Sequence, residues 1–149
     1  MAEKEKMIFD ILRGINGRMN EATQELLAPL GITMPQAMIL VSIHENDGMR
    51  ITELADRLKT TCANCSTICQ RLEKAELLVR NRNEKDQRVV HLSLTPKAQD
   101  MIESIYNKIN EIEELFFLQA SEEEKSVILD GLKILYDHMN KVKGKMLLK

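Results

Sequence analysis

Residues 51–80 read ITELADRLKTTCANCSTICQRLEKAELLVR, and this stretch decides the fold. It parses as two short helices joined by a tight turn, because apolar residues recur at helical spacing on both sides of a break. Thr52 is the predicted N-cap of the first helix and Thr61 that of the second, since a hydroxyl oxygen can accept from an unpaired backbone amide. The pattern predicts a helix-turn-helix, with a purely structural helical hairpin as the alternative. The inward residues would be Leu54, Ala55 and Leu58 of the first helix and Cys65, Ile68, Cys69 and Leu72 of the second.

The outward face of the second helix carries small and polar side chains. Such side chains have hydrogen-bonding ends and little bulk. They suit a helix lying in a major groove, where donors, acceptors and the thymine methyl group are displayed. We therefore expect a recognition helix that reads double-stranded DNA. The residues on this face are Thr61, Cys62, Ala63, Asn64, Ser66, Thr67, Gln70 and Arg71.

A two-stranded hairpin is predicted directly after this helix. Its strands are residues 77–82 and 88–94, which contain β-branched side chains, and a polar turn separates them. Guanidinium groups near the tip of such a hairpin can contact phosphates or enter a narrow minor groove. A hairpin in this position is a wing. The cationic residues near its tip are Arg82, Lys85 and Arg88.

Three long segments outside this region carry apolar residues at alternating spacings of four and three, which keeps a stripe on one helix face. Helix-start signals agree with two of these segments, because Thr95 precedes a proline and Ser121 with Glu124 forms a capping box. A shorter helix is predicted to begin at Thr33 and to run to about Asn46. For any single stripe, internal core packing is the simpler interpretation. Together they favour packing against a second copy of the chain. The stripes are Ile8, Leu12, Ile15, Met19, Ala22 and Leu26; Ala98, Ile102, Ile105, Ile109, Ile112 and Phe116; and Ile128, Leu132, Leu135, Met139, Val142 and Met146.

The length of 149 residues, with 44% apolar residues, fits one folded domain. The predicted fold class is mainly α with a small β-wing: a winged helix-turn-helix with long N- and C-terminal dimerisation helices. Residues 33–95 would form the DNA-binding part, and residues 5–30 with 96–146 the helical dimerisation part. No run reaches the roughly 18 apolar residues that span a bilayer, and the N-terminus lacks a signal-type block. We therefore expect a cytoplasmic protein with no membrane partner.

The net charge of −2 is unevenly distributed. Residues 50–97 contain ten Lys and Arg against six Asp and Glu, whereas the rest of the chain contains eleven against seventeen. A basic reading surface on an acidic support would produce this polarity, because cationic side chains displace the counterions of a phosphate backbone. A solvated charged surface is the alternative interpretation.

The sequence resembles the MarR (multiple antibiotic resistance regulator) family of bacterial transcription factors. The resemblance covers nearly the whole chain, and its most specific part is Asp86-Gln87-Arg88 followed by Leu92-Ser93-Leu94-Thr95, which looks like the family's wing signature. It implies a homodimer that reads a pseudo-palindromic operator, often with a small-molecule or oxidant-sensing site near the junction of the dimer and DNA-binding parts. By the same resemblance, Asp86 would brace Arg88 at the wing tip.

Three residues depart from the family pattern. Thr67 stands where an arginine is frequent and Thr60 where an apolar residue is usual, so base preferences do not transfer. Glu76 stands where the family commonly ends the recognition helix with glycine, the residue that adopts a left-handed conformation at least cost. The exit from this helix is therefore predicted to be irregular.

The three cysteines lie within eight residues, at i, i+3 and i+7 of the second helix. Core packing is the first interpretation for Cys65 and Cys69, because a free cysteine behaves as a small hydrophobe. Cys62 lies in the first turn, where a thiol is more easily deprotonated, so a redox role for Cys62 with Cys65 is the alternative. A zinc or iron-sulfur site is disfavoured because one continuous helix lacks the loops that such sites prefer.

Enzymatic functions find little support, because no glycine-rich phosphate loop or nucleophile elbow is present. The Cys-x-x-Cys pair, Cys62 and Cys65, lacks the surrounding βαβ pattern of a thiol oxidoreductase. We expect a non-enzymatic regulator without cofactor or metal that represses transcription as an operator-bound homodimer and responds to a small molecule or an oxidant. The alternatives are a winged-helix module that binds protein and a thiol-based sensor acting through Cys62.

Overall fold

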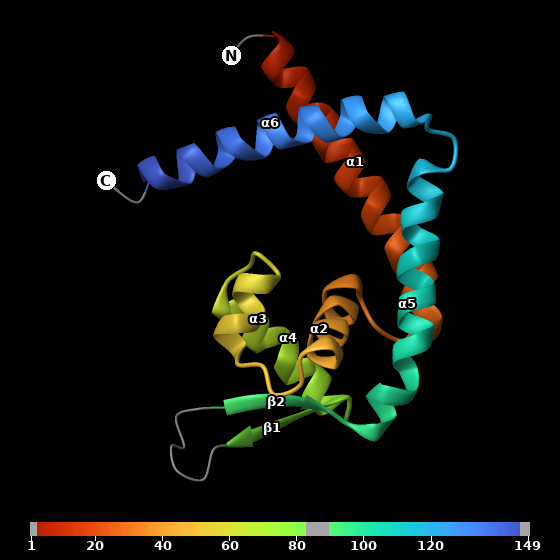
Figure 1. Ribbon diagram of the computed structural model, residues 1–149, viewed down its shortest axis with the longest axis vertical. Coiled ribbons are helices and arrows are strands. Elements are labelled where there is room, and N and C mark those ends of the chain that lie inside the picture. Colours follow the sequence, from red (N-terminus) through yellow and green to blue (C-terminus); the bar gives the residue numbers. More distant parts are fainter. Residues whose placement is uncertain (1–2, 83–89, 147–149) are drawn as a thin grey trace. The chain divides into compact units, whose positions relative to one another are not determined.

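The computed structural model describes residues 3–82 and 90–146, with side chains up to residue 142. It is mainly helical with one small antiparallel sheet, which confirms the predicted fold class (Figure 1). The chain divides into two compact units, residues 1–112 and 113–149, and the division falls inside α5. The elements are α1 (Glu3–Leu27), the 3-10 turn η1 (Ala28–Leu30), α2 (Met34–Glu45), α3 (Ile51–Arg57), α4 (Cys62–Lys74), β1 (Leu78–Arg82), β2 (Val90–Leu94), α5 (Pro96–Phe117) and α6 (Glu122–Met146).

Three helices begin where side chains satisfy the unpaired amides of the first turn, as predicted. The Thr33 backbone amide donates to the Gln36 side-chain oxygen at 2.8 Å before α2. The Thr95 hydroxyl oxygen accepts from the third residue of α5 at 3.2 Å. At the start of α6, Ser121 and Glu124 each accept the other's backbone amide, at 3.2 and 2.8 Å. These helix starts are therefore encoded locally.

The predicted cap of α3 is wrong by two residues. The N-cap is Arg50, and Thr52 is the second helical residue and is exposed. The Glu53 carboxylate accepts both the Arg50 backbone amide and its guanidinium, each at 2.8 Å. The hydrogen bond from the Arg50 side chain lowers the pKa of Glu53. A charge-assisted bond to the chain before the helix therefore sets its start, in place of a hydroxyl cap.

The sheet consists of β1 and β2 in antiparallel register, from Leu78 opposite Leu94 to Arg82 opposite Val90. Met49 adds an isolated bridge to Leu92, which ties the chain before α3 to the middle of β2. The β hairpin therefore follows α4 directly, as predicted. The residues between its strands, 83–89, lie outside the described residues.

The core of the first unit lies around α2. Six of its twelve residues are buried, and α2 packs against α1, α3, α4 and β2. The core extends through α3, α4 and β2 into the first half of α5. Fully buried large side chains include Ile39, Leu40, Ile43, Leu54, Leu72, Leu92 and Ile105.

The three predicted apolar stripes have different environments. The stripe of α5 is largely buried, with Ala98, Ile102, Ile105 and Ile112 in the core. By contrast, most apolar side chains of α1 and α6 are exposed on the single chain. Helical periodicity thus predicted all three helices, but burial distinguishes one internal stripe from two without a partner in the described chain.

Among the described residues, no single helix combines the length and apolarity needed to cross a membrane. The segment Glu3–Leu30 and α2 reach that length and apolarity only together, across a 63° bend.

Candidate nucleic-acid interface

Helix α4 has one buried face and one exposed polar face. Cys65, Cys69 and Leu72 are fully buried, and Ile68 is half-buried beside them. α4 packs on α2, α3 and β1, so its inner face belongs to the core. The outer face is available to a partner. Its residues Thr61, Cys62, Ala63, Asn64, Thr67, Gln70 and Arg71 are exposed, and Ser66 is half-buried.

The first turn of α4 is held by two hydrogen bonds between neighbouring side chains and backbone. The Thr61 hydroxyl oxygen accepts the Asn64 backbone amide at 3.2 Å, as the predicted N-cap. The Asn64 side-chain amide donates to the Thr60 hydroxyl at 3.0 Å. Thr60, where an apolar residue is usual in the family, therefore orients Asn64. The Asn64 amide must leave this bond, or share it, to contact a base.

Further along α4, the Thr67 hydroxyl donates to the Ala63 carbonyl oxygen at 3.0 Å. Its proton is thus used within the helix. Gln70 and Arg71, by contrast, are exposed, and their side chains form no hydrogen bond or ion pair with the described part of the chain. Of the predicted reading residues, these two have the longest side chains and the greatest freedom to extend toward a ligand.

Arg80 is a structural residue that the sequence analysis did not single out. Its guanidinium donates to the Ser66 carbonyl oxygen at 3.2 Å, which ties β1 to the middle of α4. Its Nε lies 3.2 Å from a Glu73 carboxylate oxygen, an ion pair without hydrogen-bond alignment. The sequence could have indicated this inward position. Residues two apart in a strand lie on the same face, so Arg80 shares a face with the buried Leu78. Arg80 therefore links β1 to α4.

The exit from α4 is regular, although glycine is absent. Glu76 itself adopts the left-handed conformation, with φ 59°. The Leu77 amide returns to the Leu72 carbonyl oxygen at 2.9 Å, and the Thr95 hydroxyl donates to the Glu76 carbonyl oxygen at 2.8 Å. The chain therefore leaves α4 in an ordinary turn, and the predicted irregularity is limited to Glu76, whose left-handed conformation is strained because it has a Cβ. The hydrogen bond from Thr95, at the start of α5, holds Glu76 in this conformation.

The described part of the wing presents Arg82 as an exposed cation at the end of β1. At the base of the wing, His91 Nδ1 lies 2.7 Å from the Gly48 carbonyl oxygen, which joins β2 to the loop before α3. The other wing residues predicted to act at the tip lie outside the described residues. They are Lys85, Asp86 and Arg88.

The cysteines differ in exposure as the core interpretation predicts. Cys65 and Cys69 are buried and Cys62 is exposed, and all three are free thiols. Burial raises the pKa of Cys65, and it raises the pKa of Cys69 to about 11. These two thiols are therefore protonated near neutral pH and unreactive. Within the described ranges, no three His, Cys, Asp or Glu side chains lie together as a metal site.

These features define the class of the protein. A rigidly capped helix presents small polar side chains, and a wing with an exposed arginine is fixed directly beside it. Such a helix fits a major groove, while cations on a wing contact the DNA backbone. The chain has the DNA-binding fold called the winged helix-turn-helix.

Comparison with known proteins relates the DNA-binding part to one family. The MarR family model matches residues 32–90. The uncharacterised transcriptional regulator YsmB of Bacillus subtilis (strain 168) is 28% identical over 87% of this chain and 89% of its own. The transcriptional repressor MdtR of the same strain is 26% identical, over 70% of either chain. The structure of S. aureus MepR in complex with DNA superposes with a TM-score of 0.78 at 24% identity, covering 86% of this chain and 95% of MepR.

The match to the MarR family model therefore spans the winged helix-turn-helix from the start of α2 to the start of β2. The chain is similar to a regulator of this type over 87% of its length, and its fold is that of MepR.

Proposed function

We propose that the chain acts as a homodimer that binds a pseudo-palindromic operator and represses transcription from it. α4 would enter the major groove and read bases through the face from Thr61 to Arg71. The wing, with Arg82, Lys85 and Arg88, would contact the backbone or the minor groove, and Asp86 would brace Arg88. The observation that carries this proposal is the exposed polar face of α4 beside a wing that Arg80 holds in place.

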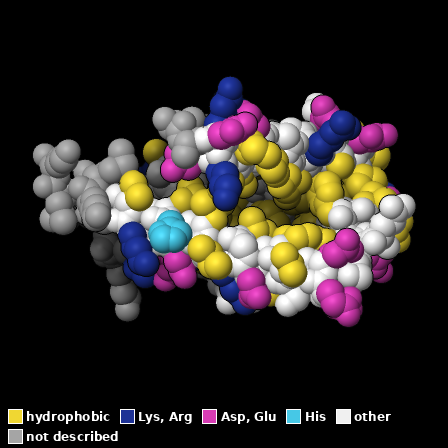
Figure 2. Space-filling view, turned by 90° about the horizontal axis from the view of Figure 1, so that it is seen from above, with side chains coloured by type: hydrophobic (Ala, Val, Ile, Leu, Met, Phe, Trp, Pro, Cys, Tyr) yellow, Lys and Arg dark blue, Asp and Glu magenta, His cyan; other side chains and the backbone are white. Residues whose placement is uncertain are grey.

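The homodimer is supported by the unpartnered apolar faces of α1 and α6. On α1, Ile8 and Ile15 are each 47% exposed, and on α6, Leu132 is 50% and Met139 62% exposed. Figure 2 shows many hydrophobic side chains at the surface in the view that it draws. Soluble monomers rarely leave so many large apolar side chains in water. A second copy would cover the same stripes on both chains at once.

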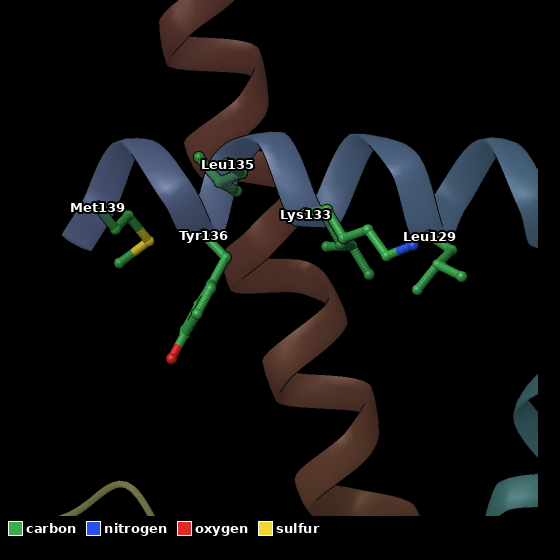
Figure 3. Close-up of a pocket in the computed structure, with 6 residues that line it drawn as sticks. Leu129, Lys133, Leu135, Tyr136 and Met139 are labelled. Carbon is green, nitrogen blue, oxygen red and sulfur yellow. The ribbon is translucent and has the colours of Figure 1, made fainter. Parts of the chain in front are cut away.

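Two apolar hollows in the second unit also support the proposed homodimer. A groove of about 410 Å³ is lined by residues of α6 alone. Figure 3 shows Leu129, Lys133, Tyr136 and Met139 projecting from the same side of the helix. A second groove, of about 700 Å³, lies between the end of α5 and the start of α6 and includes Phe117 and Ile128. Side chains of a partner helix would fill both grooves.

Repression is proposed by analogy with MdtR, a repressor that is similar over 70% of either chain. A dimer on an operator would exclude the transcription machinery, and a signal that weakens DNA binding would restore expression. The signal is proposed to be a small molecule or an oxidant. Binding to chromosomal DNA would place the protein in the cytoplasm.

An oxidant signal has one observation in its favour: Cys62 is the exposed thiol, and it lies on the reading face of α4. Reaction with a hydroperoxide would convert this thiol to a sulfenic acid, with reduction of the peroxide to an alcohol or water. We expect peroxide to weaken duplex binding by the wild type but not by Cys62→Ser. Equal loss in both proteins would exclude the cysteine mechanism.

Base reading is tested by selecting bound duplexes from a random pool with the wild type and with two variants. Gln70→Ala should change the preferred sequence, because it removes a side chain proposed to read a base edge. Arg82→Ala should weaken binding to all duplexes and leave the preferred sequence unchanged. Gln99→Ala, an exposed glutamine on α5, is the control and should change neither. The reverse pattern for Gln70 and Arg82 would refute the assignment of reading helix and wing.

A further inference from the structure

One carboxylate in the first unit joins three helices. Glu45 is the last residue of α2, and its Oε2 forms an ion pair with the guanidinium of Arg57, the last residue of α3. Its Oε1 accepts the hydroxyl hydrogen of Tyr106, in the middle of α5, at 3.1 Å. Both carboxylate oxygens are thus bonded, and each holds a different helix to α2. We call these three residues the Glu45 bridge.

The environment of Tyr106 favours this bond. The Tyr106 side chain is half-buried, and its ring meets the His44 ring edge-on, with 6.4 Å between the ring centroids and 72° between the planes. Burial raises the pKa of Tyr106. The hydrogen bond to Glu45 raises it further, because a phenolate would lose this bond and face the carboxylate. The phenol therefore stays protonated near neutral pH and remains a donor.

Helix α5 has few polar attachments to the helix-turn-helix. At its start, the Thr95 hydroxyl donates to the Glu76 carbonyl oxygen at 2.8 Å, and Lys97 donates to the carbonyl oxygen of Ala75 at 3.0 Å. Beyond this first turn, α5 makes one side-chain hydrogen bond to another helix in the part of the chain that the structure describes, from Tyr106. Tyr106 lies about 14 Å further along the helix axis than Lys97. Two directional attachments at different heights resist a pivot of α5 about its start, whereas apolar packing is not directional.

The direction of α5 matters for the proposed homodimer. The boundary between the two units falls after residue 112, and α5 continues beyond it to Phe117. The helix therefore leads from the helix-turn-helix to α6, which carries part of the proposed interface. In a two-fold dimer, the covalent path from one α4 to the other runs along both copies of α5. A pivot of α5 would change the separation of the reading helices, and one base pair along DNA is only about 3.4 Å.

We infer that Glu45 is a positioning residue for operator recognition. By bonding α3 and α5 with one carboxylate, it sets the spacing between half-sites that the proposed homodimer accepts. Glu45 contacts no base in this role, and the bases within each half-site are read by α4. The inference rests on the proposed function, because spacing has a meaning only for a dimer on a two-part operator.

The spacing role is tested with duplexes that carry two copies of the selected half-site, separated by spacers that differ by single base pairs. Wild type should prefer one spacer length. Tyr106→Phe removes only the hydroxyl, and it should reduce this preference by about two- to tenfold, the range that the loss of one hydrogen bond allows. The preferred bases within the half-site should stay the same. Partial unfolding, by contrast, would weaken binding to all spacers in equal proportion.

Further variants sharpen this test. Glu45→Ala removes both bonds and should reduce the spacing preference at least as much as Tyr106→Phe. Because Tyr106 acts through Glu45, the double variant Glu45→Ala/Tyr106→Phe should be no less selective than Glu45→Ala alone. Lys108→Gln is the control. It removes the ion pair of Lys108 with Glu111, which lies inside α5, and should leave the spacing preference unchanged.

The bond itself is tested without DNA, by titrating the tyrosines of the full-length protein and following their ultraviolet absorbance. The chain contains two tyrosines, and Tyr106→Phe identifies the signal of each. Glu45→Gln keeps the size of the side chain but removes its charge. It should therefore lower the pKa of Tyr106 toward the ordinary value.

Three outcomes would overturn the inference. The first is a Tyr106 pKa that is the same in wild type and Glu45→Gln, since the bond would then not form in solution. The second is a spacing preference that Tyr106→Phe and Lys108→Gln reduce equally, or that neither reduces. The third is a wild type that binds the half-site but accepts every spacer equally. A wild type that binds no duplex would instead refute the proposed function, and the spacing role would fall with it even where the titration confirms the bond.

Discussion

Helices α5 and α6 carry the same apolar pattern but use it differently. α5 buries its stripe in the first unit, where Ile105 is 0% and Ile112 3% exposed. α6 is similarly long and amphipathic, yet Leu132 is 50% and Met139 62% exposed on it. The helical spacing of apolar residues in the sequence determines that each helix has an apolar face. Whether that face is covered by the same chain or by another depends on tertiary packing.

The comparison gives the two helices different roles. α5 supports the winged helix-turn-helix from inside, because its first half completes the core around α2. It also meets α2 at the surface, where the Tyr106 hydroxyl donates to a Glu45 carboxylate oxygen at 3.1 Å. α6 has no comparable burial in the single chain. Substitutions in α5 should therefore act on folding, and substitutions in α6 on association.

The largest expected effect is that of Ile105→Ala on α5. Removing a fully buried isoleucine side chain to the β-carbon should lower the free energy of unfolding by about 2–5 kcal/mol. Ile134→Ala on α6 is the matched control, because Ile134 is 60% exposed and lies off the stripe. It should change stability by less than about 0.5 kcal/mol. Urea unfolding measures both, and equal losses would contradict the contrast between the helices.

The next effect concerns association. Leu132→Asp should weaken the proposed dimer by at least about a hundredfold, or about 3 kcal/mol, because a carboxylate would be buried in the proposed interface without a partner. Val127→Asp introduces the same charge at a position on α6 that is 72% exposed and off the stripe, and should leave the dimer intact. Sedimentation equilibrium gives both dissociation constants. A dimer of unchanged affinity in Leu132→Asp would exclude Leu132 of α6 from the proposed interface, and a monomeric wild type would contradict the proposed dimer itself.

A smaller effect, on the free energy of unfolding, is expected at the turn between α4 and β1 in the first unit. Glu76→Gly should raise the free energy of unfolding by up to about 1 kcal/mol, because glycine adopts the left-handed conformation without a Cβ clash. Glu76→Ala retains the Cβ and should give no such gain. Thermal unfolding of the two variants separates relief of backbone strain from loss of the carboxylate.

The smallest effect is a pH dependence at the start of α3. The hydrogen bond from Arg50 lowers the pKa of Glu53, so Glu53 stabilises the folded state fully above the ordinary carboxyl pKa. This contribution is lost as the pH falls through the lowered value in the folded protein. Arg50→Gln should return the Glu53 pKa toward its ordinary range. NMR titration of the Glu53 carboxyl carbon measures the shift, and an unchanged pKa in the variant would contradict the stated cause.

Much of the fold could be predicted because its signals are local. The caps at Thr33, Thr95 and Ser121 each depend on side chains within three residues, and the helix starts follow from them. The start of α3 was predicted wrongly because its cap is formed by Arg50 and Glu53 together. In the sequence, these two charged residues cannot be distinguished from an ordinary exposed ion pair.

The candidate site could be predicted only in part. Burial along α4 recurs at spacings of four and three, at Cys65, Cys69 and Leu72, so the helical period of the sequence predicted which residues form the exposed face. The contact of Arg80 with Ser66 and the bond of Tyr106 with Glu45 could not be predicted. Both depend on how elements meet that lie many residues apart, and no spacing within one helix encodes that geometry.

The central claim is that the face of α4 and the wing bind duplex DNA. Its most direct test is the affinity of the wild type for a selected duplex, measured against a scrambled duplex from low to physiological salt. We expect a tighter complex with the selected duplex, steep weakening with salt, and a log–log slope smaller by about one in Arg82→Ala. Binding that is independent of salt, or equal for the two duplexes, would contradict the claim.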